Sequence, residues 1–290
     1  MKRIISAIRR LVNNPYQFLL LLFVEIKKLK PLPIKPVQKR INGVLFEFDC
    51  AYNPTIGDMY VGGYEVETVE LMKRILREGD VFIDVGANIG YLSAIGAGFV
   101  GKAGQVHSFE PVPCYFSQLK KMAKMNPGYK IVVNQCALGE KRGIAPIKVS
   151  GLKDIGFNSM VPGLMENSSE VKEIFEVSVY RLEDYIKEKA IDKVSLIKID
   201  VEGWEFPVLK GLSNWFKSTK HLPHIICEIK PGTYHLLGCT LTQLIEYMQT
   251  FNYKSYNLVN TRKEVCISRL KGSTNVLFVS TGKSEKVTKI

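Results

Sequence analysis

A glycine-rich loop after a strongly apolar run carries the sharpest chemical signal in this sequence. The segment VFIDVGANIGYLS (81–93) reads as a buried strand that ends near Asp84, followed by Gly86, Asn88 and Gly90 and then by a helix. Glycines at such a strand end allow a ligand to approach the backbone at the carboxyl edge of a parallel sheet. The G-x-N-x-G spacing differs from that of dinucleotide-binding loops, and a carboxylate before the glycines would repel a pyrophosphate. A ligand with an ammonium group suits Asp84 better.

A second acid, Glu110, ends the next predicted strand in the segment VHSFEP (106–111), 24 residues after Gly86. An acid at the end of the second strand of such a unit accepts hydrogen bonds from both ribose hydroxyls of a nucleoside. Ammonium recognition near Asp84 and ribose recognition at Glu110 together describe S-adenosylmethionine. The pair of acids at this spacing therefore favours a nucleoside cofactor.

The third signal is LIKIDVEGWEFPVLKGL (196–212), an apolar strand that ends in Asp200 and is followed by Glu202, Gly203 and a helix. The blocks DVGANIG, FEP, NQCALGE and KIDVEGWEFPVLKG, in this order, resemble the FkbM-type S-adenosylmethionine-dependent methyltransferases over roughly residues 60–280. The KIDVEG-type block is the more specific part, because DxGxNxG occurs in many methyltransferases. The resemblance implies an α/β fold with a seven-stranded, mostly parallel Rossmann-like methyltransferase sheet. It also implies O-methylation of a hydroxyl on a sugar or another metabolite.

The resemblance assigns positions around the cofactor and contains one departure. CEIKPG (227–232) carries Lys230 where many relatives have the histidine of an EIH sequence. If that histidine helps to remove the acceptor's proton, this chain must use another group, or its acceptor differs. The matched positions are Asp84, Gly86, Asn88 and Gly90 for the cofactor loop, Glu110 for the ribose acid, Ala137 and Leu138 beside adenine, Asp200 at the fourth strand tip, and Glu65 in a G-x-E-type element ahead of the first strand.

Two carboxylates are the candidates for catalysis, Asp200 and Glu228, each at a predicted strand end on the ligand edge. Methyl transfer from a sulfonium needs mainly in-line positioning, with a base that takes the hydroxyl proton late. Asp200 could instead orient the cofactor or cap a helix, and Glu228 could belong to a structural ion pair. No metal is expected, because His221 and His224 form an HxxH pair without a third ligand and no acid cluster follows Asp200.

Other polar and aromatic residues have two readings each. Asn158 and Ser159 either line the acceptor pocket or form a hairpin tip, whereas Trp204 and Trp215 fit the core face of a helix better than a base-stacking platform. Two other functions stay open on the same fold, a nicotinamide-dependent oxidoreductase and a non-catalytic nucleoside-binding protein. The loop spacing and Asp84 argue against the first, and the acids at three strand tips argue against the second.

The elements that must position these residues follow from alternating apolar runs and helical patterns. Such alternation predicts βαβ units and a parallel sheet with helices on both faces. An inserted hairpin interrupts it over 143–181, and the last strand is expected to pair antiparallel at the sheet edge. Short strands and turns are expected from residue 44, where VLFEFDC precedes Gly57, Gly62 and Gly63. The predicted strands are 81–85, 106–109, 130–133, 194–199, 224–229 and 275–280, with helices over 113–125 and 240–250.

Charge divides the chain into three parts: a basic arm and Pro-rich linker (1–40), a methyltransferase domain (41–281) and a basic tail (282–290). The arm holds ten Lys/Arg and one acid, whereas the domain holds 27 basic and 26 acidic residues, so the net charge of +12 belongs to the ends. A neutral body argues against nucleic acid as partner and favours a small-molecule or glycan acceptor. The composition is globular, and six scattered cysteines without a CxxC pair indicate a reducing, cytoplasmic compartment.

The arm has its own set of interpretations. Residues 1–30 predict two helical pieces, the second with seven consecutive apolar residues (18–24), too few to span a bilayer. A basic amphipathic segment of this kind can bind an anionic membrane surface. Packing of residues 18–24 on the domain, or a signal anchor, are the alternatives. The domain is therefore expected to be cytoplasmic, with membrane association through residues 1–30 as an option.

Overall fold

The computed structural model describes residues 22, 31–51, 53–150, 158–164 and 171–280. The chain forms two compact units, one of residues 1–39 and 47–66 and the other of residues 40–46 and 67–290. The predicted arm lies, apart from Leu22 and the linker that begins at residue 31, outside the described residues, as does the tail, so the roles assigned to them stay predictions. In the part of the chain that the structure describes, no helix combines the length and apolar character needed to cross a membrane.

Helix α3 (Pro54–Val61) lies in the first unit, where the sequence suggested only strands and turns. The side chain of Asn53 accepts a hydrogen bond from the Thr55 N–H, and Pro54 occupies the first helical turn, where its missing N–H costs nothing. The helix ends at Gly62, which adopts a left-handed φ of 76°. Strands β1 (Val37–Ile41) and β2 (Val44–Phe48) form a two-stranded sheet, so the expectation of a short strand at residue 44 is confirmed.

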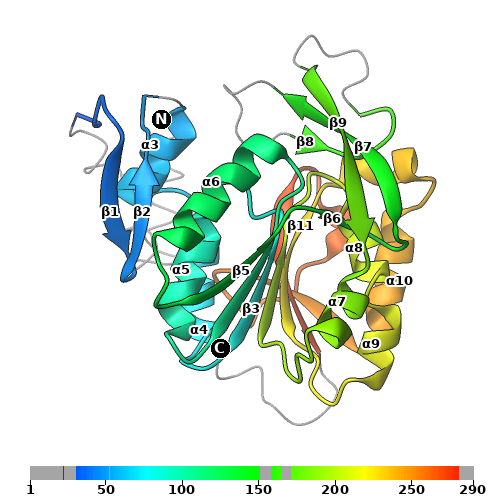
Figure 1. The fold of residues 1–290 in the computed structure, drawn as a ribbon. Helices are drawn as coiled ribbons and strands as arrows, with labels where there is room; N and C mark the ends of the chain where they lie inside the picture. Colours follow the sequence, from blue (N-terminus) through cyan, green and yellow to red (C-terminus); the bar gives the residue numbers. More distant parts are fainter. Residues whose placement is uncertain (1–21, 23–30, 52, 151–157, 165–170, 281–290) are drawn as a thin grey trace. The chain divides into compact units, whose positions relative to one another are not determined.

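Seven strands of the second unit form the central sheet in the order β12-β13-β11-β10-β3-β4-β5 (Figure 1). Neighbouring strands from β11 to β5 run parallel, and β13 pairs antiparallel with both β11 and β12. The predicted seven-stranded, mostly parallel sheet is confirmed. The strands are β3 (Val81–Val85), β4 (Gln105–Phe109), β5 (Lys130–Asn134), β10 (Leu196–Ile199), β11 (His224–Ile229), β12 (Tyr253–Asn257) and β13 (Thr274–Ser280).

The edge of this sheet differs from the expectation in one respect. The last strand, β13, is antiparallel as predicted, but β12 lies outside it and forms the edge. The sequence of β12, YKSYN, has no apolar run, since only Tyr253 and Tyr256 are buried and polar residues separate them. This strand owes its conformation to the ladder with β13, a non-local effect that local periodicity does not report.

Helices cover both faces of the central sheet, as predicted (Figure 1). On the first face, α5 is buried along almost its whole length and lacks polar side chains except Ser93. An added Cβ at Gly96 of α5 would lie 2.4 Å from the Phe82 ring, so glycine is needed for this close helix–strand contact. The first face carries α4 (Val66–Ile75), α5 (Tyr91–Val100) and α6 (Pro113–Lys124), and the second α7 (Leu182–Glu188), α8 (Glu205–Lys210), α9 (Ser213–Ser218) and α10 (Leu241–Thr250); two 3-10 helices, η1 (Pro231–Leu237) and η2 (Ile267–Arg269), follow β11 and β12.

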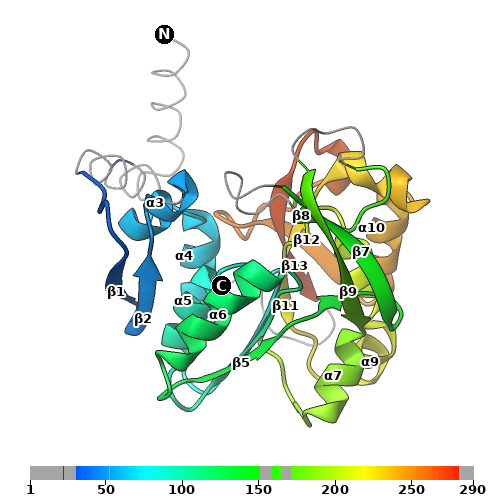
Figure 2. The ribbon, with the colours of Figure 1, turned by 45° about the horizontal axis from the view of Figure 1, so that its top comes forward.

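A second sheet, in the order β6-β9-β7-β8, contains the predicted inserted hairpin. Both views place it beyond the end of the central sheet, near the label of β11 (Figures 1 and 2). The Ser159 hydroxyl donates a hydrogen bond of 2.8 Å to the backbone oxygen of Glu202, which fixes the sheet to the loop after β10. The strands are β6 (Ala137–Leu138), β7 (Gly143–Ser150), β8 (Asn158–Ser159) and β9 (Val171–Tyr180).

Candidate active site

The register of the parallel strands brings the predicted acids to one edge and one face of the sheet. Asp84 on β3 is the partner of Lys198 on β10, and Ile199 is the partner of Cys227 on β11. Side chains alternate between faces along each strand, so residues two apart share a face. Asp200 therefore follows Lys198 on its face and lies opposite Glu228, at the carboxyl ends where α/β sheets bind ligands.

The glycine loop passes very close to the end of β10. Gly86 has a φ of 80°, and a Cβ added there would lie 1.9 Å from the backbone oxygen of Asp200. The N–H groups of Gly86 and Ala87 both donate to the Phe109 backbone oxygen, at 3.0 and 2.9 Å, which ties the loop to β4. Gly90, with a φ of 91°, is the N-cap of α5. Only glycine fits at Gly86 for both conformational and steric reasons.

Glu110 joins the end of β4 to the glycine loop. Its two carboxylate oxygens accept hydrogen bonds of 2.8 Å from the N–H groups of Asn88 and Val112. The side chain is only 5% exposed, and burial raises the pKa of Glu110 to about 7, although both N–H groups lower it. Each carboxylate oxygen keeps a further lone pair, so Glu110 can still accept hydrogen bonds from a ligand in the pocket.

Asp84 lies deeper than the ligand contact that the sequence suggested for it. The carboxyl is 2% exposed, accepts a hydrogen bond of 2.6 Å from the Ser93 hydroxyl and does not line the pocket. Burial raises the pKa of Asp84 to about 6, whereas the Ser93 hydroxyl and the Lys198 charge lower it. Direct contact of Asp84 with a ligand ammonium stays a prediction. In this structure the Asp84 carboxyl binds Ser93 of α5, the helix that follows the glycine loop.

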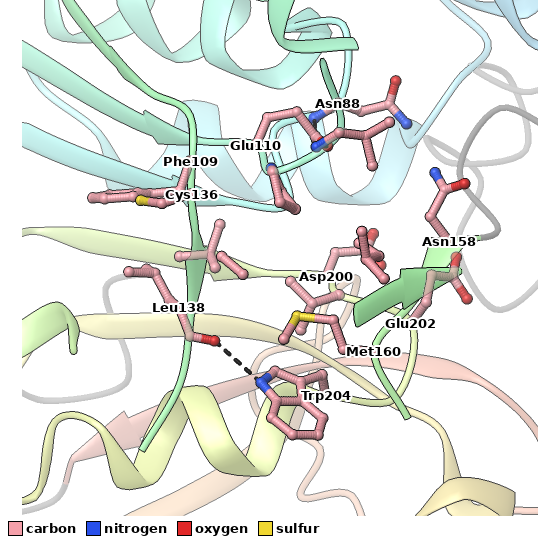
Figure 3. Close-up of a pocket in the computed structure, with 17 residues that line it drawn as sticks. Asn88, Phe109, Glu110, Cys136, Leu138, Asn158, Met160, Asp200, Glu202 and Trp204 are labelled. Atoms are coloured by element: carbon pink, nitrogen blue, oxygen red, sulfur yellow. Dashed lines mark hydrogen bonds between the residues drawn. The ribbon is translucent and has the colours of Figure 1, made fainter. Parts of the chain in front are cut away.

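A pocket opens between the glycine loop, the loop after β10 and the second sheet, to which β6 belongs (Figure 3). Ile147 of β7, Asn158 of β8 and Met160 line it, so the inserted sheet supplies part of its wall. Of the two readings of Asn158, the pocket position is the observed one, and its Oδ1 is buried without a hydrogen-bond partner among the described residues. The predicted cofactor residues that line the pocket are Gly86, Asn88, Glu110, Ala137, Leu138 and Asp200.

Trp204 packs against the core, as the sequence indicated, and also lines the pocket. The residue precedes α8 as its N-cap, lines the pocket and donates a hydrogen bond of 3.2 Å from its Nε1 to the Leu138 backbone oxygen (Figure 3). Both Trp204 and Trp215 pack against the core cluster, as expected, and Trp204 lines the pocket in addition. An aromatic residue near a strand end can pack in the core and line a pocket, and the sequence alone does not distinguish these two positions.

Three carboxylates and two lysines meet beside this pocket. Lys198 Nζ lies 2.7 Å from Asp200 Oδ2, and Lys230 forms an ion pair with Glu202. Glu228 accepts a hydrogen bond on Oε1 from the Ser273 hydroxyl, while its Oε2 is buried with no partner among the described residues. Carboxylate oxygens of Asp200, Glu202 and Glu228 lie within 4.8 Å of one another, so the fold assembles the acid group that sequence spacing did not indicate.

The two central acids of this group have opposite pKa shifts. Burial favours the neutral form of Asp200, but the charge and hydrogen bond of Lys198 outweigh it, so the pKa of Asp200 lies below its usual value. Burial and the neighbouring Asp200 charge raise the pKa of Glu228 to about 7. Environments that separate the pKa values of two adjacent acids also separate their chemical roles.

Chelators are expected to leave the activity unchanged. Lys198 and Lys230 already neutralise Asp200 and Glu202, which reduces the attraction of the three carboxylates for a divalent cation. Methyl transfer rates should be equal with and without EDTA after dialysis of the protein. A loss of rate in EDTA that added Mg²⁺ restores would show that the carboxylates hold a metal.

Three further positions were singled out from the sequence: Glu65, His221 and His224. Glu65 belongs to the first unit, with a φ of 51°, and its cofactor role stays a prediction. His221 is exposed and His224 begins β11; within the described ranges neither belongs to a group of metal-ligating side chains. Lys198, which sequence reasoning treated as part of an apolar strand, is the functional candidate that it missed.

Comparisons with known proteins agree with this site. The family model described as "Methyltransferase FkbM domain" matches residues 84–255, which contain the glycine loop, Glu110, Asp200 and Glu228. A 31-O-demethyl-FK506 methyltransferase FkbM of Streptomyces tacrolimicus is 32% identical over 164 residues, which are 48% of this chain and 62% of that protein. A hexuronic acid methyltransferase AglP of Haloferax volcanii is 27% identical over 168 residues, 58% of this chain and 63% of that protein.

The matched parts cover about three fifths of these relatives' lengths. Among solved structures, a methyltransferase FkbM from Methylobacillus flagellatus KT is 17% identical, with a TM-score of 0.44 over 78% of this chain and 54% of that one. The family model alone spans more than half of the chain. The family model covers the residues that line the pocket from the glycine loop to Trp204, and the chain belongs to the FkbM family of methyltransferases.

Proposed function

We propose that this methyltransferase uses S-adenosylmethionine to methylate a hydroxyl group on a sugar or another metabolite. One observation carries the proposal: the strand register brings a ribose-type acid, a glycine loop without room for a Cβ, and Asp200 to one pocket, with Glu228 beside Asp200. The relatives' names, which contain 31-O-demethyl-FK506 and hexuronic acid, support an oxygen acceptor of small-molecule or glycan type.

The residues around the pocket fit the proposed cofactor. Glu110 has lone pairs free for two ribose hydroxyls, and Gly86 and Asn88 of the glycine loop line the same pocket. Ala137 and Leu138 of β6 offer apolar contact for adenine on the side where Trp204 closes the pocket. The cofactor would supply an electrophilic methyl group on a sulfonium, so the protein's task is to place the acceptor oxygen in line and to take its proton.

The acid pair supplies the proton acceptor in this proposal. A lone pair of the acceptor oxygen forms the new bond to the methyl carbon, while the electron pair of the carbon–sulfur bond stays with sulfur. The acceptor's O–H bond breaks with its electron pair kept on oxygen, and the proton passes to Glu228. A base works best when its pKa lies near the working pH, which fits Glu228 better than Asp200.

Two measurements test the proposed function. Titration calorimetry should show binding of S-adenosylmethionine and of its demethylated product, with no binding of NAD. Incubation with labelled S-adenosylmethionine and fractionated cell extracts should yield a product about 14 mass units heavier than its precursor. Tighter binding of NAD than of S-adenosylmethionine would instead support the oxidoreductase alternative.

Glu110→Ala is expected to weaken S-adenosylmethionine binding by ~1.5–3 kcal/mol, about ten- to a hundredfold, because charge-assisted hydrogen bonds to the ribose are lost. Calorimetry measures the change. Glu264→Ala is the matched control, because it removes a glutamate from the exposed ion pair with Lys254 outside the pocket. Equal affinity of Glu110→Ala and the wild-type protein would remove Glu110 from the cofactor site.

Cofactor affinity is also expected to fall as the pH drops through about 7. The ionised form of Glu110 accepts ribose hydrogen bonds better than the protonated form, so binding favours loss of the proton. Below a pH of about 7 the free protein must first lose that proton, and the apparent affinity declines by up to about tenfold for each further pH unit. Calorimetry between pH 5.5 and 8.5, as a range around that value, should show the decline, and a flat profile would contradict it.

A further inference from the structure

A buried lysine, Lys198, contacts Asp200, which is the neighbour of the proposed proton acceptor Glu228. The Lys198 side chain is 1% exposed, on the face of β10 that α5 covers. Burial of an ammonium group is costly unless anions compensate it, so a lysine at this place needs paired carboxylates. Asp200 provides one at 2.7 Å, and Asp84, the register partner on β3, provides the second negative charge.

Of the two neighbouring acids, Asp200 and Glu228, Lys198 contacts Asp200. Its Nζ contacts Oδ2 of Asp200, whereas Glu228 is held by the Ser273 hydroxyl on Oε1. The cation therefore stabilises the charge of Asp200 directly, and the Asp200 charge in turn disfavours a second anion at Glu228. The titratable and charged groups around Lys198 are Asp84 on β3, Asp200, Glu202 and Glu205 after β10, and Cys227, Glu228 and Lys230 on or after β11.

We propose that Lys198 is a positioning residue that keeps Asp200 an anion and thereby makes Glu228 the group that takes the acceptor's proton. The inference rests on the proposed function for the identity of that proton. Without the cation, two half-buried carboxyls side by side share one proton, and neither has a separate role. Lys198 thus determines which acid is the base, although it does not line the pocket itself.

A simpler reading makes Lys198 only a structural partner in the core. The two readings differ in what replacement of the lysine does to titration. A structural role predicts loss of stability with unchanged ionisation of the surviving acids. The positioning role predicts that the proton affinity of the Asp200–Glu228 pair rises when the positive charge is removed.

The closing experiment follows the two carboxyls by NMR in protein labelled with ¹³C at the Asp and Glu side-chain carbons. Difference spectra of Asp200→Asn and Glu228→Gln assign the two signals. In the wild-type protein Asp200 should stay ionised through the pH range in which Glu228 titrates, near 7. If Asp200 takes a proton in that same range, the proposal is wrong, and this result requires no variant of Lys198.

Lys198→Met and Lys198→Arg extend the test. Lys198→Met should raise the titration midpoints of the pair by at least about one pH unit, an approximately tenfold change in proton affinity, and shift the pH–rate profile upward equally. Lys198→Arg keeps the charge and should restore most of the wild-type profile. Lys254→Met is the matched control. It breaks an exposed ion pair outside the pocket, in which Lys254 Nζ lies 2.8 Å from Glu264 Oε1, and it should change neither midpoint.

The outcomes separate this proposal from the proposed function. The NMR titration needs neither cofactor nor acceptor, so its result stands if no methyl acceptor is found. Folded Lys198→Met protein with unchanged midpoints would overturn the positioning role alone. Failure of the wild-type protein to bind S-adenosylmethionine would overturn the proposed function, whatever the two carboxyls do.

Discussion

Replacing Gly86 with alanine is expected to weaken S-adenosylmethionine binding by at least ~100-fold and to abolish measurable methyl transfer. The added Cβ would lie 1.9 Å from the Asp200 backbone oxygen and 2.9 Å from its carbonyl carbon. The carbonyl group of Asp200 cannot shift away from the new Cβ by itself, because the Asp200 N–H donates a hydrogen bond of 3.0 Å to the Val85 backbone oxygen. The ends of β3 and β10 must therefore separate, and the loop that carries Asn88 leaves Glu110.

Gly79→Ala is the matched control for this effect. Gly79 has a φ of 86°, close to that of Gly86, but a Cβ added there would meet no described atom within 4 Å. Both replacements carry the conformational cost of alanine in the left-handed region, ~1–2 kcal/mol. Thermal unfolding should report that shared cost, and calorimetry should report a loss of cofactor affinity for Gly86→Ala alone. Similar cofactor affinities in the two variants would contradict a cofactor role of the loop.

The strand ends were predictable because each is an apolar run that stops at an acid. VFIDV, VHSF and LIKI form β3, β4 and β10 within one or two residues of the expected bounds, and parallel topology then places Glu110 and Asp200 at one edge. The same logic failed for β12, whose polar sequence forms a strand only because β13 offers it a ladder. Local pattern thus reports the buried centre of a sheet better than its edge.

The charge arrangement of the site was beyond the sequence because it depends on register. Lys198 stands inside an apolar strand, and nothing local shows that Asp84 lies beside it or that Glu228 lies opposite Asp200. A lysine inside a run such as LIKI is nevertheless a signal, since a central strand tolerates an ammonium group only with buried anions nearby. The acid at the end of the same strand, Asp200, was the signal in the sequence for the partner of Lys198.

The pocket wall that the inserted sheet supplies was the least predictable part of the site. Ile147, Asn158 and Met160 reach it from the inserted sheet, whose position depends on the contact of Ser159 with the Glu202 backbone oxygen. Hairpin tips and pocket walls have the same polar composition, so sequence could only offer both readings for Asn158. Oδ1 of Asn158 is buried in this wall without a hydrogen-bond partner among the residues that the structure describes.

Glu228→Gln is expected to lower the turnover number by ~10²–10⁴-fold while cofactor affinity stays nearly unchanged. Glutamine keeps the size of the side chain and can still accept the hydrogen bond from Ser273, but it cannot take a proton. The wild-type rate should rise with pH through about 7, the pKa to which burial and Asp200 raise Glu228, because the ionised form is the base. In Glu228→Gln this rise should disappear.

Asp200→Asn gives the decisive comparison, because it also removes an acid from the pair but leaves Glu228 in place. Without the Asp200 charge the pKa of Glu228 should fall, so the residual rate of this variant should rise with pH at a lower midpoint than in the wild-type protein. Turnover should also fall more than cofactor affinity, since Asp200 lines the pocket next to the proposed base, Glu228. If instead Glu228→Gln keeps the wild-type turnover and Asp200→Asn loses the pH dependence, Asp200 is the base. Such a result would require Lys198 to release Asp200 during the reaction, because an aspartate held at 2.7 Å by a buried ammonium group is too weak a base to take the proton.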